Sequence, residues 1–295
     1  AIFVGADAKL DLCARKVNKL TLQTIERFVA SDAFEGLVDG GAMRLAFPIG
    51  VKADAVIVVK LDRNSTQEAA RKAGASLAIE KGPRPMLLLA GNVGRADDVA
   101  LGLMLRDYSY VDHKTATPTL RGAVTCMMTT PEDVNVVKLR AVAEGVFFTR
   151  DLTNAPANDL TTISFGDRLA EMQALGLKVE VLEEDKLADL GMGALLCVGQ
   201  GSASPSKVVV MQWNGGGEEA PFALVGKGVV FDTGGISIKP AGGMEDMTMD
   251  MGGAGVVSGV MKVLAMRNAR ANVVGLVGIV ENMPSDRAVR PGDVV

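Results

Sequence analysis

The chain has 295 residues and a formal net charge of −4 at pH 7. This acidic balance gives no electrostatic footprint for nucleic acid, so we expect no nucleic-acid partner. Hydrophobic residues make up 48% of the chain and aromatic residues only 4%, and a core packed with small aliphatic side chains favours an α/β protein over a β-sandwich.

Cysteine usage and apolar runs indicate the compartment. Three widely spaced cysteines, Cys13, Cys126 and Cys197, form no C-x-x-C pair and indicate reducing conditions. We find no apolar run of the about 18 residues that a membrane helix needs, and residues 1–30 lack the layout of a signal peptide. We therefore expect a soluble cytoplasmic protein without a membrane partner. The single histidine, His113, excludes a zinc site built from several imidazoles of one chain.

Short apolar runs alternate with helical patterns in the first part of the chain. Predicted strands cover 53–61 (ADAVIVVKL) and 84–91 (RPMLLLAG), and predicted helices cover 65–81 and the residues from about 96 onward. This βαβ rhythm predicts a mostly parallel sheet. The loop-rich passage TATPTLRGAV and the TTPED turn that follows it place a domain boundary near residue 130.

The second part opens with a long predicted helix, 133–154, which Pro156 ends. Further helices are predicted at 161–176, 184–199 and 249–267, and strands at 177–183, 206–214, 222–231 and 271–282. We therefore expect two α/β domains, residues 1–130 and 131–295. Each should hold a mostly parallel or mixed sheet flanked by helices.

Charged residues gather where strand 222–231, predicted to be central in its sheet, ends in the stretch FDTGGISIKPAGGMEDMTMD (231–250). Ligands of open α/β sheets bind beyond the carboxyl ends of the strands, which is where this glycine-rich turn is predicted to lie. Lys227 and Asp232 are an odd number of positions apart, so a regular strand would aim them at opposite faces. The glycines around Lys227 permit a bulge or a close approach that brings the two side chains together.

Two more aspartates follow on the next predicted helix. Asp246 and Asp250 are four residues apart and share a face near its start. Turn formation and helix capping explain any one of these aspartates alone, and Asp246 is interpreted as a cap. A charged lysine inside an apolar strand is costly, however, unless it meets a carboxylate or a metal or loses its proton. Lys227 therefore indicates that the charges of this stretch act together.

Three kinds of site compete for this cluster. A phosphate loop would need the order G-x-x-x-x-G-K-[ST], which the sequence does not show. An aspartic protease needs two Asp-Thr-Gly triplets or a symmetric dimer, and the chain has one triplet, at 232–234. A metal-activated hydrolase explains both lysines, because one lysine can bind the metal as a neutral amine while Lys239, still charged, stabilises an oxyanion.

The segment VGKGVVFDTGGISIKPAGGMEDMTMDMGGAG (225–255) resembles the metal-binding core of the leucyl aminopeptidase family of metallo-exopeptidases. The likeness extends through TRDLTNAPAND (149–159), CVGQGSASP (197–205) and VGIVENMPSDRAVRPGDVV (277–295). It covers the chain from about residue 130 onward. The earlier residues resemble the variable N-terminal domain of that family only in size and in their βαβ rhythm.

The resemblance implies a role for each residue of the cluster. Lys227, Asp232 and Asp250 would be metal ligands, and Asp232 would bridge two divalent ions, either Mn²⁺ or Zn²⁺, or alternatively Mg²⁺. Lys239 would be the catalytic lysine, which polarises the scissile carbonyl, and Met247 would line the pocket for the first side chain of the substrate. The implied reaction removes a leucine-like N-terminal residue from a peptide with a free N-terminus. The family assembles as hexamers, so a homo-hexamer is expected.

The chain departs from the family in one motif. The family carries a second motif, N-T-D-A-E-G-R-L, which supplies an aspartate, a glutamate that joins both metals and an arginine that holds bicarbonate. No D-A-E-G-R occurs in these residues, so the bicarbonate arginine is absent from this chain. The resemblance therefore implies an incomplete C-terminal domain with an unpaired apolar sheet edge. The alternative is a non-catalytic oligomerisation module or an inactive fragment of the same family.

Overall fold

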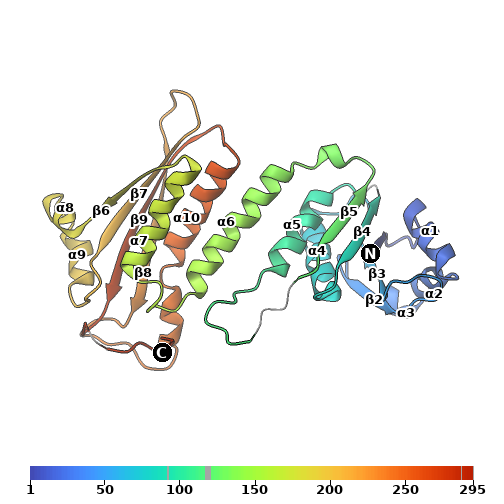
Figure 1. Ribbon diagram of the computed structural model, residues 1–295, viewed down its shortest axis with the longest axis horizontal. Coiled ribbons are helices and arrows are strands. Elements are labelled where there is room, and N and C mark those ends of the chain that lie inside the picture. Colours follow the sequence, from blue (N-terminus) through green and yellow to red (C-terminus); the bar gives the residue numbers. More distant parts are fainter. Residues whose placement is uncertain (92, 117–120, 287, 295) are drawn as a thin grey trace. The chain divides into compact units, whose positions relative to one another are not determined.

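The computed structural model describes residues 1–91, 93–116, 121–286 and 288–294. It divides into two compact units, Ala1–Ser109 with Thr115–Leu139 and Tyr110–Lys114 with Arg140–Val295 (Figure 1). Both units combine a sheet with helices, which confirms the predicted α/β class. The predicted domain limits, 1–130 and 131–295, stay a prediction. Part of the predicted boundary loop, 117–120, lies outside the described residues.

Unit 1 is built on a five-stranded sheet in the order β2-β3-β1-β4-β5. Only β2 pairs in the antiparallel sense among the described strands of this sheet, so the sheet is mixed and mostly parallel, as predicted. The strands are β1 Ile2–Val4, β2 Ala42–Ala46, β3 Ala55–Lys60, β4 Met86–Gly91 and β5 Val124–Met128. The helices are α1 Leu12–Leu20, α2 Thr24–Val29, α3 Asp32–Glu35, α4 Gln67–Lys81, α5 Ala96–Asp107 and the 3-10 turn η1 Pro131–Asp133.

Helix α4 illustrates how local sequence builds unit 1. Thr66 caps it, because its side chain accepts a hydrogen bond from the backbone N–H of Ala69. Small residues then allow α5 to approach closely. A methyl group added at Gly74 would lie 2.0 Å from the carbonyl oxygen of Val99. The predicted strands at 53–61 and 84–91 and the helix between them are confirmed as β3, β4 and α4.

Unit 2 contains a four-stranded mixed sheet in the order β6-β7-β9-β8, in which β8 and β9 are parallel and the other pairs antiparallel. The strands are β6 Lys178–Leu182, β7 Lys207–Asn214, β8 Phe222–Asp232 and β9 Asn272–Asn282. The helices are α6 Val136–Asn154, α7 Thr162–Ala170, α8 Glu184–Asp189, α9 Gly193–Gly199 and α10 Gly252–Met266, with the 3-10 turns η2 Glu171–Leu175 and η3 Met244–Met249.

The position of β8 differs from the prediction. Strand 222–231 was expected to be central, but β8 is an edge strand of the described sheet. A continuous apolar run indicates burial of both faces of a strand and carries no information about which edges are paired. Phe222 and Val225 are exposed on β8, so this edge is apolar, as the family resemblance implied.

The core of unit 2 lies between one face of the sheet and the helices α6, α7 and α10 (Figure 1). Its fully buried side chains include Leu152 of α6, Phe165 of α7 and Met261 of α10. Helix α9 lies against the other face, because a methyl group added at Gly278 of β9 would lie 3.0 Å from a methyl carbon of Leu195. The sheet is therefore covered by helices on both faces.

Two predicted helices begin or divide differently in the structure. Helix 184–199 is split into α8 and α9, because Gly191 between them adopts a φ of +70°. Helix 249–267 begins only at Gly252, since the turn η3 precedes it. Asp246 thus lies exposed on η3 and Asp250 forms its C-cap. Asp246 does not cap α10, whose N-cap is Met251.

One described segment, Met244–Met266, is long and apolar enough to cross a membrane by length and composition, with 23 residues and a mean hydropathy of 1.2 in its best window. The segment contains Asp250 and Lys262, so it is not an uninterrupted apolar run of the kind considered in the sequence. The packing of α10 explains the apolar character, because Ala254, Met261 and Ala265 contribute to the core of unit 2.

The glycines that flank Lys227 let the first turn of α10 approach β8. A methyl group added at Gly226 would lie 2.7 Å from Cα of Ala254, and one at Gly228 would lie 2.6 Å from the carbonyl oxygen of Gly278. The close approach at these glycines is to α10 and to the neighbouring strand β9, and it does not by itself bring Lys227 and Asp232 together. It fixes the distance between α10 and the strand that carries the charged cluster.

Gly226→Ala is expected to lower the free energy of unfolding of unit 2 by about 1–3 kcal/mol, because the new methyl group must displace the backbone of α10. Gly193→Ala is the control, since a methyl group there meets nothing within 4 Å. The control should be neutral or stabilise by at most about 1 kcal/mol. Urea unfolding followed by the fluorescence of Trp213, the single tryptophan, measures both. Equal effects would contradict the packing argument.

Candidate functional site

The site lies at the carboxyl ends of β8 and β9, and a β-bulge determines its geometry. From Val229 to Asp232, β8 advances three residues while β9 advances two. As a result Lys227 and Asp232 stand opposite Gly278 and Asn282, which are four residues apart on β9. The lysine and the aspartate therefore lie on the same face of the sheet. The bulge follows the glycines that flank Lys227 instead of coinciding with them.

Two lysine–aspartate pairs form the centre of the site. Lys239 Nζ donates a hydrogen bond to Asp232 Oδ2 at 2.5 Å and lies 3.1 Å from the sulfur of Met247. Lys227 Nζ donates to Asp250 Oδ1 at 2.5 Å. The structure thus brings the five residues singled out in the sequence into two groups, one around each lysine. Both groups connect β8 to the η3 turn or its C-cap.

The environment of Asp232 keeps its carboxylate ionised. Oδ1 accepts hydrogen bonds from the backbone N–H of Gly234 at 2.9 Å and from Asn282 Nδ2 at 2.7 Å. Burial by itself raises the pKa of Asp232. The hydrogen bonds from Lys239, Gly234 and Asn282, together with the charge of Lys239, outweigh that effect, so the pKa lies below its ordinary value. Asp232 is therefore an anion at neutral pH.

The turn after β8 brings Lys239 back to Asp232. Gly234 and Gly235 adopt φ angles of +91° and +75°, which residues other than glycine rarely adopt. The turn is closed by a hydrogen bond of 2.8 Å from the backbone N–H of Lys239 to the carbonyl oxygen of Thr233. The DTGG sequence thus serves a geometric purpose: it places a lysine next to the aspartate that ends the strand.

The exposure of Lys227 differs from what its place in an apolar strand predicts. The side chain of Lys227 is 61% exposed, so the desolvation penalty expected for a lysine inside an apolar strand does not apply. The reason is the edge position of β8, which leaves this side chain in contact with solvent. The expected carboxylate partner is nevertheless present, because Lys227 is paired with Asp250.

The donor set of the site fits a divalent cation. Asp250 Oδ2 is buried and has no hydrogen-bond partner among the residues that the structure describes. A buried carboxylate oxygen without a donor is costly unless a cation meets it. The oxygens of Asp232 and Asp250 are hard ligands that suit Mn²⁺, Mg²⁺ and Zn²⁺. Within the described residues no group of three or more His, Cys, Asp and Glu could hold a metal. An ion here would therefore depend on these two aspartates and on the amine of Lys227.

Sequence reasoning missed the two polar residues that end β9. Glu281 is buried and accepts hydrogen bonds from Ser202 and Arg290, which ties the segment after β9 to the sheet. Asn282 contacts Asp232 directly. The signal in the sequence is the pair Glu-Asn that closes an otherwise apolar strand, at the end of the sheet where ligands bind.

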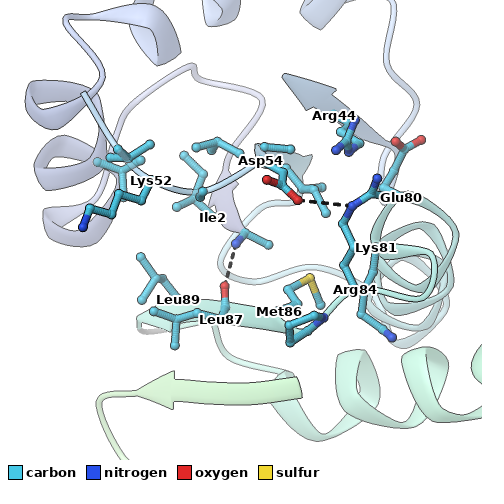
Figure 2. A pocket seen from close by; sticks show the side chains of 18 residues that line it. Ile2, Arg44, Lys52, Asp54, Glu80, Lys81, Arg84, Met86, Leu87 and Leu89 are labelled. Carbon is cyan, nitrogen blue, oxygen red and sulfur yellow. Dashed lines mark hydrogen bonds and ion pairs between the residues drawn. The ribbon is translucent and has the colours of Figure 1, made fainter. Parts of the chain in front are cut away.

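A separate cavity of about 490 Å³ lies within unit 1 and contains none of these residues (Figure 2). Apolar side chains of β1, β3 and β4 line it, together with several charged residues. Arg84 and Asp54 at its wall form an ion pair of 3.4 Å. No residue of the lysine–aspartate pairs or their partners contributes to it, so it does not enter the chemistry of the site.

Sequence comparison places the chain within a known group of proteins. The profile of the cytosol aminopeptidase family, catalytic domain, matches residues 147–295. Proteins named probable cytosol aminopeptidase are similar over the whole chain, with 57% identity in Cereibacter sphaeroides and 56% in Dinoroseobacter shibae. The alignments cover 100% of this chain and 61% of each relative. The chain therefore spans less than two thirds of the length of these relatives.

Solved structures with the same fold are also similar. The bottromycin maturation enzyme BotP in complex with Mn matches with a TM-score of 0.75 and 29% identity, covering 99% of this chain and 61% of that one. The cytosol aminopeptidase from Coxiella burnetii matches with a TM-score of 0.71 over 99% of this chain and 61% of that one. At 23% identity, the second likeness shows the fold alone.

The lowered pKa of Asp232 predicts how stability depends on pH. Because its folded pKa lies below the ordinary value of 3.8, the ionised carboxylate stabilises the fold above that value, and this contribution is lost as pH falls through the folded pKa. The free energy of unfolding should therefore fall more steeply below pH 3.8 in the wild type than in Asp232→Asn. Urea titrations at a series of pH values measure the slopes. Asp246→Asn, on the exposed side of η3, is the control and should keep the wild-type slope.

Proposed function

The chain belongs to the cytosol aminopeptidase family, and we propose that its site removes the N-terminal residue from peptides in a metal-dependent hydrolysis. The observation that carries the proposal is the pair of lysine–aspartate contacts beside a buried carboxylate oxygen that meets no donor among the described residues. Such a set combines two anionic oxygens with two amines at a ligand-binding edge of the sheet. Peptides with a free N-terminus and a leucine-like first residue are the proposed substrates.

Lys227, Asp232 and Asp250 are the residues that we propose would hold the two divalent ions. When bound, the divalent ions supply Lewis-acid chemistry, because they activate a water molecule near neutral pH. Binding through Lys227 requires that its amine give up its proton. The hydrogen bond between Lys227 and Asp250 holds the amine of Lys227 beside the carboxylate of Asp250, so that both groups could bind the same ion.

Lys239 is the proposed catalytic residue. Its ammonium group is held at Asp232 Oδ2 and touches the sulfur of Met247. A fixed positive charge at this position would stabilise the negative charge that develops on the oxygen of the attacked peptide carbonyl. Asp232 keeps Lys239 oriented, because its Oδ2 accepts a hydrogen bond of 2.5 Å from the ammonium group.

Met247 is the proposed contact for the first side chain of the substrate. It packs against a buried apolar cluster that includes Phe231, Met244 and Met283, while its sulfur faces Lys239. An unbranched, polarisable side chain at this point can adapt to aliphatic groups of different shape. A leucine-like residue would thus lie beside the lysine that contacts the scissile carbonyl.

Mn²⁺ is the ion to test first, with Zn²⁺ and Mg²⁺ as the others. Carboxylate oxygens suit Mn²⁺, and BotP, a structure that this chain resembles, is a complex with Mn. A homo-hexamer and a cytoplasmic location are proposed from the family likeness and from the names of the relatives. Bicarbonate is not assigned to residues of this chain, since the arginine motif of the family is not among them.

Lys239→Ala is expected to lower kcat for leucine p-nitroanilide by about 100- to 1,000-fold in the presence of Mn²⁺, because it removes an oxyanion-stabilising group. The change in KM should be smaller, since the interaction strengthens in the transition state. Lys9→Ala, at an exposed lysine of unit 1, is the control and should keep full activity. Wild-type chain that shows no turnover with any of the three metals would contradict the proposal and favour the alternative, which is a non-catalytic oligomerisation module or an inactive fragment of the same family.

Mn²⁺ binding to the purified chain, measured by isothermal titration calorimetry, tests the ligand assignment without turnover. Asp232→Ala and Asp250→Ala should each weaken binding by more than the about 10- to 100-fold typical of outer-sphere partners. Asp246→Ala is the control and should bind as the wild type does. Mn²⁺ should also raise the Tm, and EDTA should reverse the shift. The oligomerisation module predicts no tight binding at all.

A further inference from the structure

The two oxygens of Asp232 have different kinds of partner. Oδ1 accepts hydrogen bonds from two neutral N–H donors, Gly234 at 2.9 Å and Asn282 at 2.7 Å. Oδ2 accepts from the cation of Lys239 at 2.5 Å. Because neutral donors occupy the lone-pair positions of Oδ1, the oxygen that remains for positively charged partners is Oδ2. The two N–H groups therefore determine how the carboxylate plane is rotated.

Asn282 is tied to β8 and the turn after it by its main chain as well as by its side chain. It is the last residue of β9 and stands opposite Asp232 across the bulge. Its carbonyl oxygen accepts hydrogen bonds from the backbone N–H and from the hydroxyl of Thr233, at 3.0 and 2.8 Å. Main chain and side chain of one residue thus bind two consecutive residues of β8 and the turn after it.

The chemical nature of the amide matters as well. An amide N–H stabilises an anion without carrying charge, so it does not repel a cation that approaches the same carboxylate. A lysine or arginine at this position would compete with a divalent ion for Asp232. An aspartate would place two carboxylates side by side and disfavour ionisation of both. A methyl group added at Gly235 would lie 3.1 Å from Asn282 Oδ1, which shows how closely the turn covers this amide.

We propose that Asn282 is a positioning residue of the site: its side-chain amide fixes the Asp232 carboxylate so that Oδ2 is presented to Lys239 and to a divalent ion. The part that concerns the ion rests on the proposed metal-dependent function. The part that concerns the orientation of Asp232 stands on the hydrogen bonds alone. The two parts can therefore be tested separately.

The first experiment measures Mn²⁺ affinity by calorimetry in Asn282→Leu, which keeps the size of the side chain and removes the donor. Binding should weaken by about 10- to 100-fold. The control is Asn272→Leu at the other end of the same strand, where the asparagine side chain bonds to the turn residues Gly216, Gly217 and Glu219. The control should bind Mn²⁺ as the wild type does. Equal affinity in Asn282→Leu and the wild type would overturn the inference while leaving the metal function intact.

The second experiment needs no metal. Amide hydrogen exchange at Gly234, followed by NMR, reports the carboxylate orientation, because this N–H shares Oδ1 with Asn282. Exchange should become about tenfold faster in Asn282→Leu, as a hydrogen bond to a charged group is weakened, and stay unchanged in Asn272→Leu. Unchanged exchange in Asn282→Leu would overturn the positioning role. If the wild type binds no Mn²⁺ but exchange accelerates, the metal function fails and the positioning of Asp232 stands.

Discussion

The extra residue in β8 is the constraint on which the rest of the site depends. A strand without the bulge would aim Asp232 at the face where α10 packs, and a carboxylate there would be buried among apolar side chains without a partner. With the bulge, Asp232 lies on the same face as Lys227 and opposite Asn282. The turn with its two positive-φ glycines then returns Lys239 to the same carboxylate. Backbone geometry thus places every charge in the cluster.

The electrostatics of the cluster follow from this placement. Two lysines and two aspartates neutralise one another in pairs, which allows the charges to lie close together at the end of an otherwise apolar strand. The hydrogen bonding of the cluster is not complete, because one oxygen of Asp250 is buried without a donor among the described residues. A divalent ion would satisfy that oxygen, and its binding to Lys227 would require that the amine release its proton.

Local patterns predicted the elements, and the long-range arrangement remained open. Periodicity located β3, β4 and α4, and the odd spacing of Lys227 and Asp232 already required a bulge or a close approach. The edge position of β8 could not be predicted, because strand order depends on pairings between distant segments. Asn282 was missed for the same reason, since it contacts a residue 50 positions earlier. The roles of Lys239 and Met247 came from the family likeness, because spacing alone does not distinguish a catalytic lysine from a structural one.

Strand order also determines when the site can form. β9 lies between β7 and β8 although it is the last of the described strands in the chain. Until β9 joins the sheet, the edges of β7 and β8 that face it have no partner. Pairing with β9 closes longer loops than the pairing of β6 with β7, so it costs more chain entropy. The contact of Lys239 with Asp232 spans only seven positions and can arise early in folding. The amide of Asn282 arrives with β9, so the complete cluster requires that β9 has paired with β8.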